Sequence, residues 1–197
     1  MRWLALLAGL LLPPLTAPTI AWAHPHVLID SHLIFLFEAG KIAGIQMGWK
    51  FDPVYSSTLV QDFDADKSGS LSPSELATIE KEAFRDTRQY QYFTHAQVDG
   101  RVVEWPEAAN FQILVHKDAL LYAFRLNFPN PVDPRQSPLK VSTYEESFYI
   151  DIDIPNDAAV KLVGDGSQGC RAVIGQDKSN PLLGGIAFPK KVEISCP

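Results

Sequence analysis

The sequence predicts a mainly β (α+β) fold, a β-sandwich-like domain interrupted by one helix–loop–helix insertion at about residues 54–90. The chain has 197 residues, 46% of them hydrophobic, which suits one globular domain and excludes a disordered protein. Short apolar or alternating runs bounded by turn residues occur on both sides of the insertion. Only between Ser56 and Tyr90 does the apolar spacing change to that of a helix.

The first residues read as a removable export signal. Arg2 gives a short positive start, Trp3–Leu12 is an apolar run, and Ala21-Trp22-Ala23 offers a small-x-small cleavage site. A membrane anchor is the alternative, but a bilayer-spanning helix needs roughly 20 apolar residues. We therefore expect a signal peptide at residues 1–23, a single periplasmic domain at residues 24–197, and no stable insertion into a membrane.

Strands are expected on both sides of the insertion. Residues 26–37 and 42–51 are rich in Val, Ile, Leu and Phe, and the turn between them makes them a hairpin. Further runs that read as strands are Tyr92–Val98, Arg101–Val103, Phe111–Val115, Leu120–Asn127, Leu139–Thr143, Phe148–Ile154, Cys170–Ile174 and Lys191–Ser195.

The insertion is expected to hold two helices around an acidic loop, because apolar residues share one helical face on each side of it. The face before the loop comprises Tyr55, Leu59, Val60 and Phe63. The face after it comprises Leu76, Ile79, Ala83, Phe84 and Tyr90.

The acidic loop, residues 64–75 (DADKSGSLSPSE), has the spacing of an EF-hand calcium loop. Asp64, Asp66 and Glu75 occupy positions 1, 3 and 12, and Gly69 at position 6 permits the sharp turn. The remaining oxygen ligands are then the Ser68 hydroxyl, the Ser70 carbonyl and a water held by Ser72. The spacing predicts bound Ca²⁺ and makes the insertion an EF-hand.

The same residues also fit a helix start that needs no metal. Ser72 suits the N-cap, Pro73 the first helical position, and Glu75 completes a capping box. A cap explains neither the two alternate aspartates nor the glycine, so calcium is favoured. With three carboxylates and no second EF-hand, we expect a dissociation constant of roughly 10⁻⁴–10⁻³ M, which suits a structural site better than a switch.

The two cysteines, Cys170 and Cys196, are expected to form a disulfide bond. An exported chain meets oxidising conditions in which such a pair closes. A pair of thiolate metal ligands is the alternative, but structural thiolate sites usually show a tighter spacing.

A second metal site is predicted at the end that signal cleavage would create. His24 would supply its α-amine and imidazole as a brace, and His26 a third nitrogen. Pro25 has no N–H, which blocks the amino-terminal chelate built from backbone amides. His95, shortly before the Asp99-Gly100 turn, is the candidate that completes the site. Nitrogen ligands of this kind suit Zn²⁺, Ni²⁺ or Cu²⁺, whereas a solvated terminus is the alternative.

Five groups of residues support a resemblance to a known family. They are His24-Pro25-His26, Trp49-Lys50-Phe51-Asp52 with Tyr55-Ser56, the acidic loop, Tyr92-Phe93-Thr94-His95 with Val98-Asp99-Gly100, and a strand with Tyr149 and Asp151. With them the chain resembles the bacterial domain-of-unknown-function family 1007 over nearly its whole mature length. The resemblance implies a periplasmic component of an ABC-type transport system. Because members tend to be encoded near nickel, cobalt or zinc transporters, it also implies a role in handling metal ions.

We therefore expect a periplasmic metal-binding protein that serves an inner-membrane metal transporter. The net charge of −6 gives no footprint for nucleic acid and favours cations as partners. One alternative is a calcium-stabilised interaction or scaffold domain without a transition metal. A copper-dependent enzyme is less favoured, and we expect no enzyme, because the nucleophile-elbow, zinc-protease, phosphate-loop and dinucleotide motifs are missing.

Overall fold

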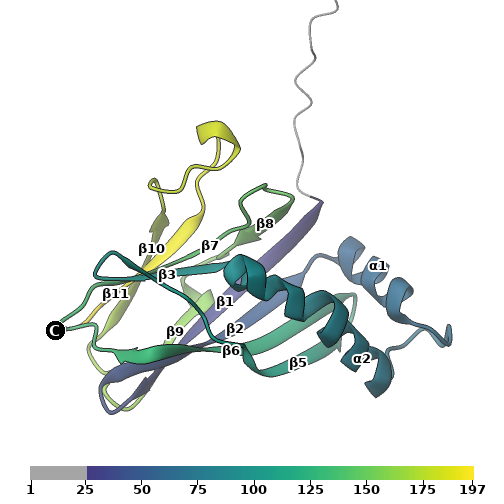
Figure 1. Ribbon diagram of the computed structural model, residues 1–197, viewed down its shortest axis with the longest axis horizontal. Helices are drawn as coiled ribbons and strands as arrows, with labels where there is room; N and C mark the ends of the chain where they lie inside the picture. The colour runs from purple at the N-terminus through teal and green to yellow at the C-terminus, as the bar shows by residue number, and fades with distance from the viewer. Residues whose placement is uncertain (1–25) are drawn as a thin grey trace, which may run out of the picture.

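Two β-sheets and a helical insertion make up the described chain, residues 26–197, in the computed structural model (Figure 1). The first sheet has the order β5 (Ala109–His116), β6 (Ala119–Val132), β2 (Lys41–Phe51), β1 (Val27–Glu38) and β8 (Ile150–Asp153), and β9 (Val160–Gly164) also pairs with β1. The second has the order β10 (Arg171–Gln176), β11 (Lys190–Ser195), β7 (Leu139–Thr143), β3 (Thr94–Val98) and β4 (Arg101–Val103). The expected mainly β fold with two sheets is confirmed.

Strand β1 organises the first sheet. It forms an antiparallel hairpin with β2, and its other edge pairs in parallel with β8 near its start and with β9 near its end. Alternate residues of β1 are buried, as the period of two in a strand requires. The hairpin expected at residues 26–51 is therefore present, with bounds shifted by one residue at three of its four strand ends.

One hydrophobic core joins both sheets and the insertion. Trp49 of β2 lies at its centre, with ring centroids 4.8 Å from Phe124 and 5.7 Å from Phe93. Phe84, which follows the second helix, stacks on Phe111 of β5 at 3.9 Å. These aromatic contacts hold the insertion against the buried face of the first sheet.

The insertion contains helix α1 (Pro53–Phe63) and helix α2 (Pro73–Ile79), and both lie at the right-hand end of Figure 1. Asp52 caps α1, because its carboxylate accepts hydrogen bonds from two amides of the first turn. Proline occupies the start of both helices, where its fixed φ is favourable.

The chain after α2 departs from the expected single helix. It forms a π-helical turn (Glu80–Phe84) and then a 3₁₀ segment (Arg85–Phe93). Three successive residues, 91–93, have positive φ and turn the chain into β3. Tyr90 was expected on the buried face, but its side chain is 56% exposed. The strand expected at 92–98 begins only at Thr94.

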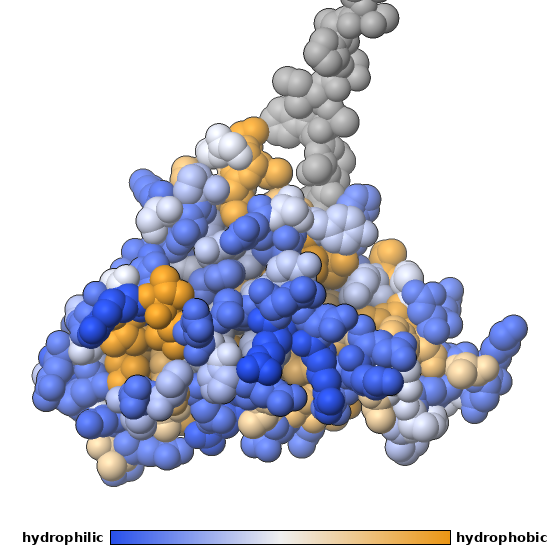
Figure 2. Space-filling view, in the orientation of Figure 1, coloured by the Kyte–Doolittle hydropathy of each residue, from blue (hydrophilic) through white to orange (hydrophobic). Residues whose placement is uncertain are grey.

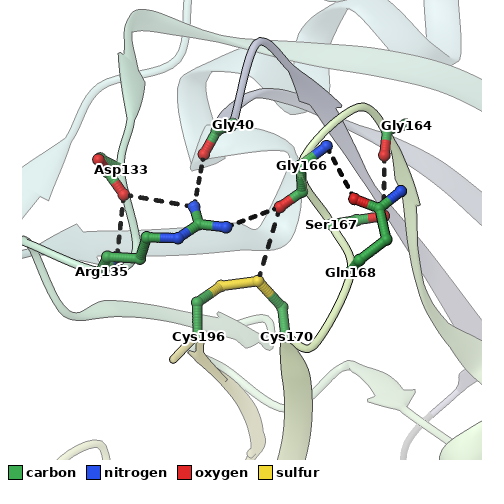
Figure 3. The surroundings of a disulfide bond; sticks show 9 residues. All are labelled: Gly40, Asp133, Arg135, Gly164, Gly166, Ser167, Gln168, Cys170 and Cys196. Atoms are coloured by element: carbon green, nitrogen blue, oxygen red, sulfur yellow. Dashed lines mark hydrogen bonds and ion pairs between the residues drawn. A yellow bond between two sulfur atoms is a disulfide. The ribbon is translucent and has the colours of Figure 1, made fainter.

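The predicted disulfide Cys170–Cys196 is confirmed, and it joins the start of β10 to the end of β11 (Figure 3). Nearby, the Arg135 guanidinium donates to the carbonyls of Gly40 and Gly166, each at 2.9 Å. Gly166 must be glycine because its φ is +86° and a Cβ there would lie 2.4 Å from the Cα of Gly40. The disulfide therefore lies beside the Arg135 side chain, whose hydrogen bonds connect the turns at Gly40 and Gly166.

Strand β9 was not predicted, because it is short and largely exposed and carries only a weak apolar pattern. None of the described helices is long and apolar enough to cross a membrane. The expected signal peptide and His24 lie outside the described residues.

Candidate metal site

Three predicted calcium ligands, Asp64, Asp66 and Glu75, come together between α1 and α2. Each offers one carboxylate oxygen, and these oxygens lie within 4.8 Å of one another. The loop that carries them projects at the right-hand end of Figure 1, where Figure 2 shows mainly hydrophilic side chains. The spacing of the sequence therefore predicted a cluster that the fold does assemble.

The first half of the loop is folded around the carboxylates of its aspartates. Asp64 accepts from the amides of Ser68 at 3.0 Å and Gly69 at 2.7 Å, and Asp66 accepts from the Ser68 amide at 2.9 Å. Gly69 has φ +80°, a conformation that costs glycine little and other residues more. The turn thus directs backbone N–H groups at the side chains that a cation would bind.

Glu75 joins the two ends of the loop. One of its oxygens accepts from the Ala65 amide at 2.7 Å, and the other accepts from the amide and the hydroxyl of Ser72, both at 2.7 Å. Ser72 accepts in turn from the Glu75 amide, so the predicted capping box is present. The capping interpretation and the clustering of the carboxylates are therefore both correct descriptions of this residue.

The serines supply further oxygens along the loop. The Ser68 hydroxyl donates to the Ser70 carbonyl at 3.0 Å, and the Ser72 hydroxyl also lies 3.0 Å from that of Ser74. Ser68 and Ser70 are exposed, and Ser72 is half-buried. Each remains able to offer a lone pair to a cation, since a hydroxyl carries two.

Within the described chain, no lysine or arginine balances the charge of this cluster. Among residues 26–197, no lysine or arginine lies within ion-pair distance of Asp64, Asp66 or Glu75. Hydrogen bonds from Ser68 lower the pKa of Asp66, and hydrogen bonds from Ser72 lower the pKa of Glu75. These two carboxylates are therefore ionised near neutral pH, and the loop presents concentrated negative charge.

The described histidines of the second predicted site lie at the two ends of one connecting segment, residues 144–149. His26 stacks on Tyr149 at 4.7 Å, and its amide donates to the Tyr149 carbonyl at 2.9 Å. His95 stacks on Tyr144 at 3.9 Å, and its Nε2 lies 3.2 Å from the Tyr144 carbonyl oxygen. Within the described chain, neither histidine joins a group of three close metal-ligating side chains.

The two histidines differ in their surroundings. His26 is exposed, whereas burial lowers the pKa of His95 and keeps it neutral at pH 7. A neutral imidazole is the form that binds a metal ion. The remaining described histidines, His32 and His116, are both exposed.

The sequence analysis missed a second polar cluster around Asp177. This carboxylate is only 2% exposed and accepts from the hydroxyls of Ser142 and Ser179 and from the Asn180 amide. Its fourth partner is the Lys140 ammonium at 3.3 Å. Polar residues in the turn 177–180 gave a weak sequence signal, but the partners on β7 could be found only from the fold.

Comparisons with known proteins place this architecture in a family. The profile described as "Protein of unknown function (DUF1007)" matches residues 9–183. A similar protein from Spirochaeta aurantia, described as "Uncharacterized 15.5 kDa protein in trpE 3'region", is 28% identical over 116 residues. The matched part covers 58% of this chain and 82% of that protein. The chain belongs to the DUF1007 family, and the predicted family resemblance is confirmed.

Proposed function

We propose that this DUF1007 protein binds Ca²⁺ in residues 64–75, which act as a single EF-hand. The observation that carries the proposal is the convergence of three carboxylate oxygens within 4.8 Å around a loop whose sixth residue has φ +80°. Calcium favours six to eight oxygen ligands in a flexible shell. The loop offers carboxylate, hydroxyl and carbonyl oxygens of this kind at the required spacing.

Calcium binding would change the hydrogen bonds of Glu75 most. Its two oxygens are now shared between Ala65 at one end of the loop and Ser72 at the other. A bidentate ligand at position 12 must turn both oxygens toward the cation. The bound ion would supply the positive charge that the described neighbourhood of the loop lacks, and the loop would keep the amide contacts of its aspartates.

The test is a calcium titration of the Glu75→Gln variant. We expect at least a tenfold loss of calcium affinity by calorimetry, because an amide replaces a charged bidentate ligand. The variant should also lose the rise in melting temperature that calcium gives the native chain. Glu82→Gln is the matched control, since Glu82 is exposed and makes no side-chain hydrogen bond or ion pair within residues 26–197. Equal calcium affinity in the native chain and Glu75→Gln would refute the site.

We also propose that the exported protein holds Zn²⁺, Ni²⁺ or Cu²⁺ at its histidine end and serves a metal-ion transporter. His24 is the brace in this proposal, with His26 and His95 as further ligands. Support comes from the family resemblance, from the neutral state of His95 and from the segment 144–149 that contacts both described histidines.

Metal analysis of the native-exported protein tests this second proposal. An extra alanine placed ahead of His24 should reduce bound transition metal while leaving bound calcium unchanged, because it displaces the amine from the imidazole. His95→Gln should also reduce bound transition metal, and His116→Gln is the control. Unchanged transition-metal content in the first two variants would leave a calcium-stabilised interaction domain as the function.

A further inference from the structure

We infer that calcium in the acidic loop sets the position of His26 relative to His95, because the start of α1 is hydrogen-bonded to Leu28 near His26, and the chain after α2 runs through residues 80–93 into β3, which carries His95. The inference rests on the proposed calcium site. It adds to that site a regulated region, at which the calcium-bound state fixes the geometry of the two imidazoles. Transition-metal binding is not needed for the coupling itself.

The first connection runs from α1 to His26 through Asp52. One Asp52 oxygen caps α1 by accepting from Val54 at 2.9 Å and Tyr55 at 3.0 Å. The other oxygen accepts from the Leu28 amide at 3.0 Å, and the Asp52 amide donates back to the Leu28 carbonyl at 3.0 Å. Leu28 is two residues from His26, so a movement of the α1 start acts directly on the start of β1.

The second connection runs from α2 to His95. Phe84 at the end of the π-helical turn is 3% exposed, and its ring packs against Trp49 and Phe124. Downstream, residues 91–93 have positive φ, a conformation that is unfavourable for residues other than glycine. The cross-links from the Trp105 and Ala108 amides to the side chains of residues 91 and 92 hold this turn in place. His95 follows two residues after it.

The segment 144–149 joins the two connections. The Tyr144 amide donates to the Phe93 carbonyl at 3.0 Å, directly at the end of the left-handed turn, and the Tyr144 ring stacks on His95. At the other end Tyr149 contacts His26. Glu145 stiffens the segment by accepting hydrogen bonds from Ser147 and from the Tyr149 amide.

Calcium can act on this assembly because it must reorganise the contacts of Glu75 at the start of α2. A close-packed interior transmits such a shift instead of absorbing it. Ligand binding of this kind changes the arrangement of two helices by local electrostatics and repacking. The two helices are anchored at their far ends to Leu28 and, through residues 84–93, to β3.

The experiment follows the histidine side chains by NMR during a calcium titration of the full-length exported protein without transition metal. The imidazole signals of His26 and His95 are assigned from His26→Gln and His95→Gln. At calcium saturation we expect both signals to move, while His116, exposed at the end of β5, stays in place. Sodium chloride at the same ionic strength controls for screening.

A second variant tests the route. Asp52→Asn keeps an oxygen for the helix cap but replaces the Leu28 acceptor with an N–H donor. We expect it to bind calcium within about threefold of the native affinity, a free-energy change of under 1 kcal/mol. The His26 response should shrink by at least half, while the His95 response persists.

Calorimetry on the same samples separates the outcomes. Saturable calcium binding with no movement of either signal would overturn the inference and leave the calcium site intact. A His26 response that is undiminished in Asp52→Asn would overturn the Asp52 route. Absence of calcium binding would refute the proposed function, and the inference would fall with it.

Discussion

The triplet Asp-Lys-Ser occurs twice in the chain, at residues 66–68 and 177–179, in opposite electrostatic surroundings. In both copies the aspartate accepts a hydrogen bond from the amide of the serine two residues later. The local turn is therefore similar. What differs is the charge and burial that the rest of the fold supplies.

The negative charge of Asp177 is balanced by neighbouring groups of the protein itself. It is buried, and the Lys140 ammonium, two serine hydroxyls and an asparagine amide surround it. These partners hold the pKa of Asp177 far below its ordinary range, chiefly through its hydrogen bonds to Ser142 and Ser179 against the opposing effect of burial. This carboxylate therefore needs no bound cation to balance its charge.

The loop at residues 64–75 differs, because no lysine or arginine of the described chain balances the charge of its carboxylates. Asp66 is exposed and has two carboxylate neighbours, and the hydrogen bonds that Asp64 and Asp66 accept within the described chain come from backbone N–H groups. Two clusters of the same residue types thus differ in whether a lysine or arginine of the described chain balances their charge. The balance of formal charge separates a structural aspartate from one that is suited to bind a cation.

Asp177→Ala should produce the largest effect on stability. It leaves Lys140, which is 19% exposed, without its counter-ion, and leaves the buried Ser142 hydroxyl without its acceptor. Removing one partner of a buried ion pair costs about 3–5 kcal/mol, and we expect about 3 kcal/mol by urea unfolding, near the lower end. Calcium affinity should remain unchanged.

The control for this prediction is Lys178→Ala, which alters an exposed neighbour in the same turn. Its stability should change by less than about 0.5 kcal/mol. If Asp177→Ala were as stable as this control, the cluster would not be the self-contained structural unit described above. Loss of calcium binding in Asp177→Ala would remove the distinction between the two aspartates.

Much of the fold follows from sequence patterns that are local. The hairpin at residues 26–51 and the helices beside the acidic loop are encoded by the period of their apolar residues and by Asp52, Pro53 and Ser72. Residues 92 and 93 were assigned to a strand for the same reason, since aromatic residues favour strands. Their left-handed conformation depends on contacts with residues 105 and 108, which no local pattern contains.

The candidate sites divide in the same way. The EF-hand spacing is contained in twelve consecutive residues, and its carboxylates could therefore be named from the sequence. The Asp177 cluster takes Lys140 and Ser142 from a strand more than thirty residues away, so only the fold reveals it. The positions of His26 and His95 at the ends of residues 144–149 also depend on the pairing of strands in both sheets.

The smallest expected effect is that of mild acid on calcium binding. Carboxylates within 4.8 Å of one another would normally raise each other's pKa, but hydrogen bonds lower the pKa of Asp66 and Glu75 below the ordinary values of 3.8 and 4.5. A carboxylate with a lowered pKa stays charged at every pH above its ordinary pKa, and it becomes protonated only as the pH falls through its lowered pKa.

Calcium affinity measured by calorimetry should therefore change by less than about twofold between pH 7 and pH 6. It should fall steeply only below about pH 4, where Asp177, with the stronger set of partners, should still be ionised. A tenfold decline between pH 7 and pH 6 would mean that the loop carboxylates share protons without a cation, and their hydrogen bonds would then not be the feature that prepares them for calcium.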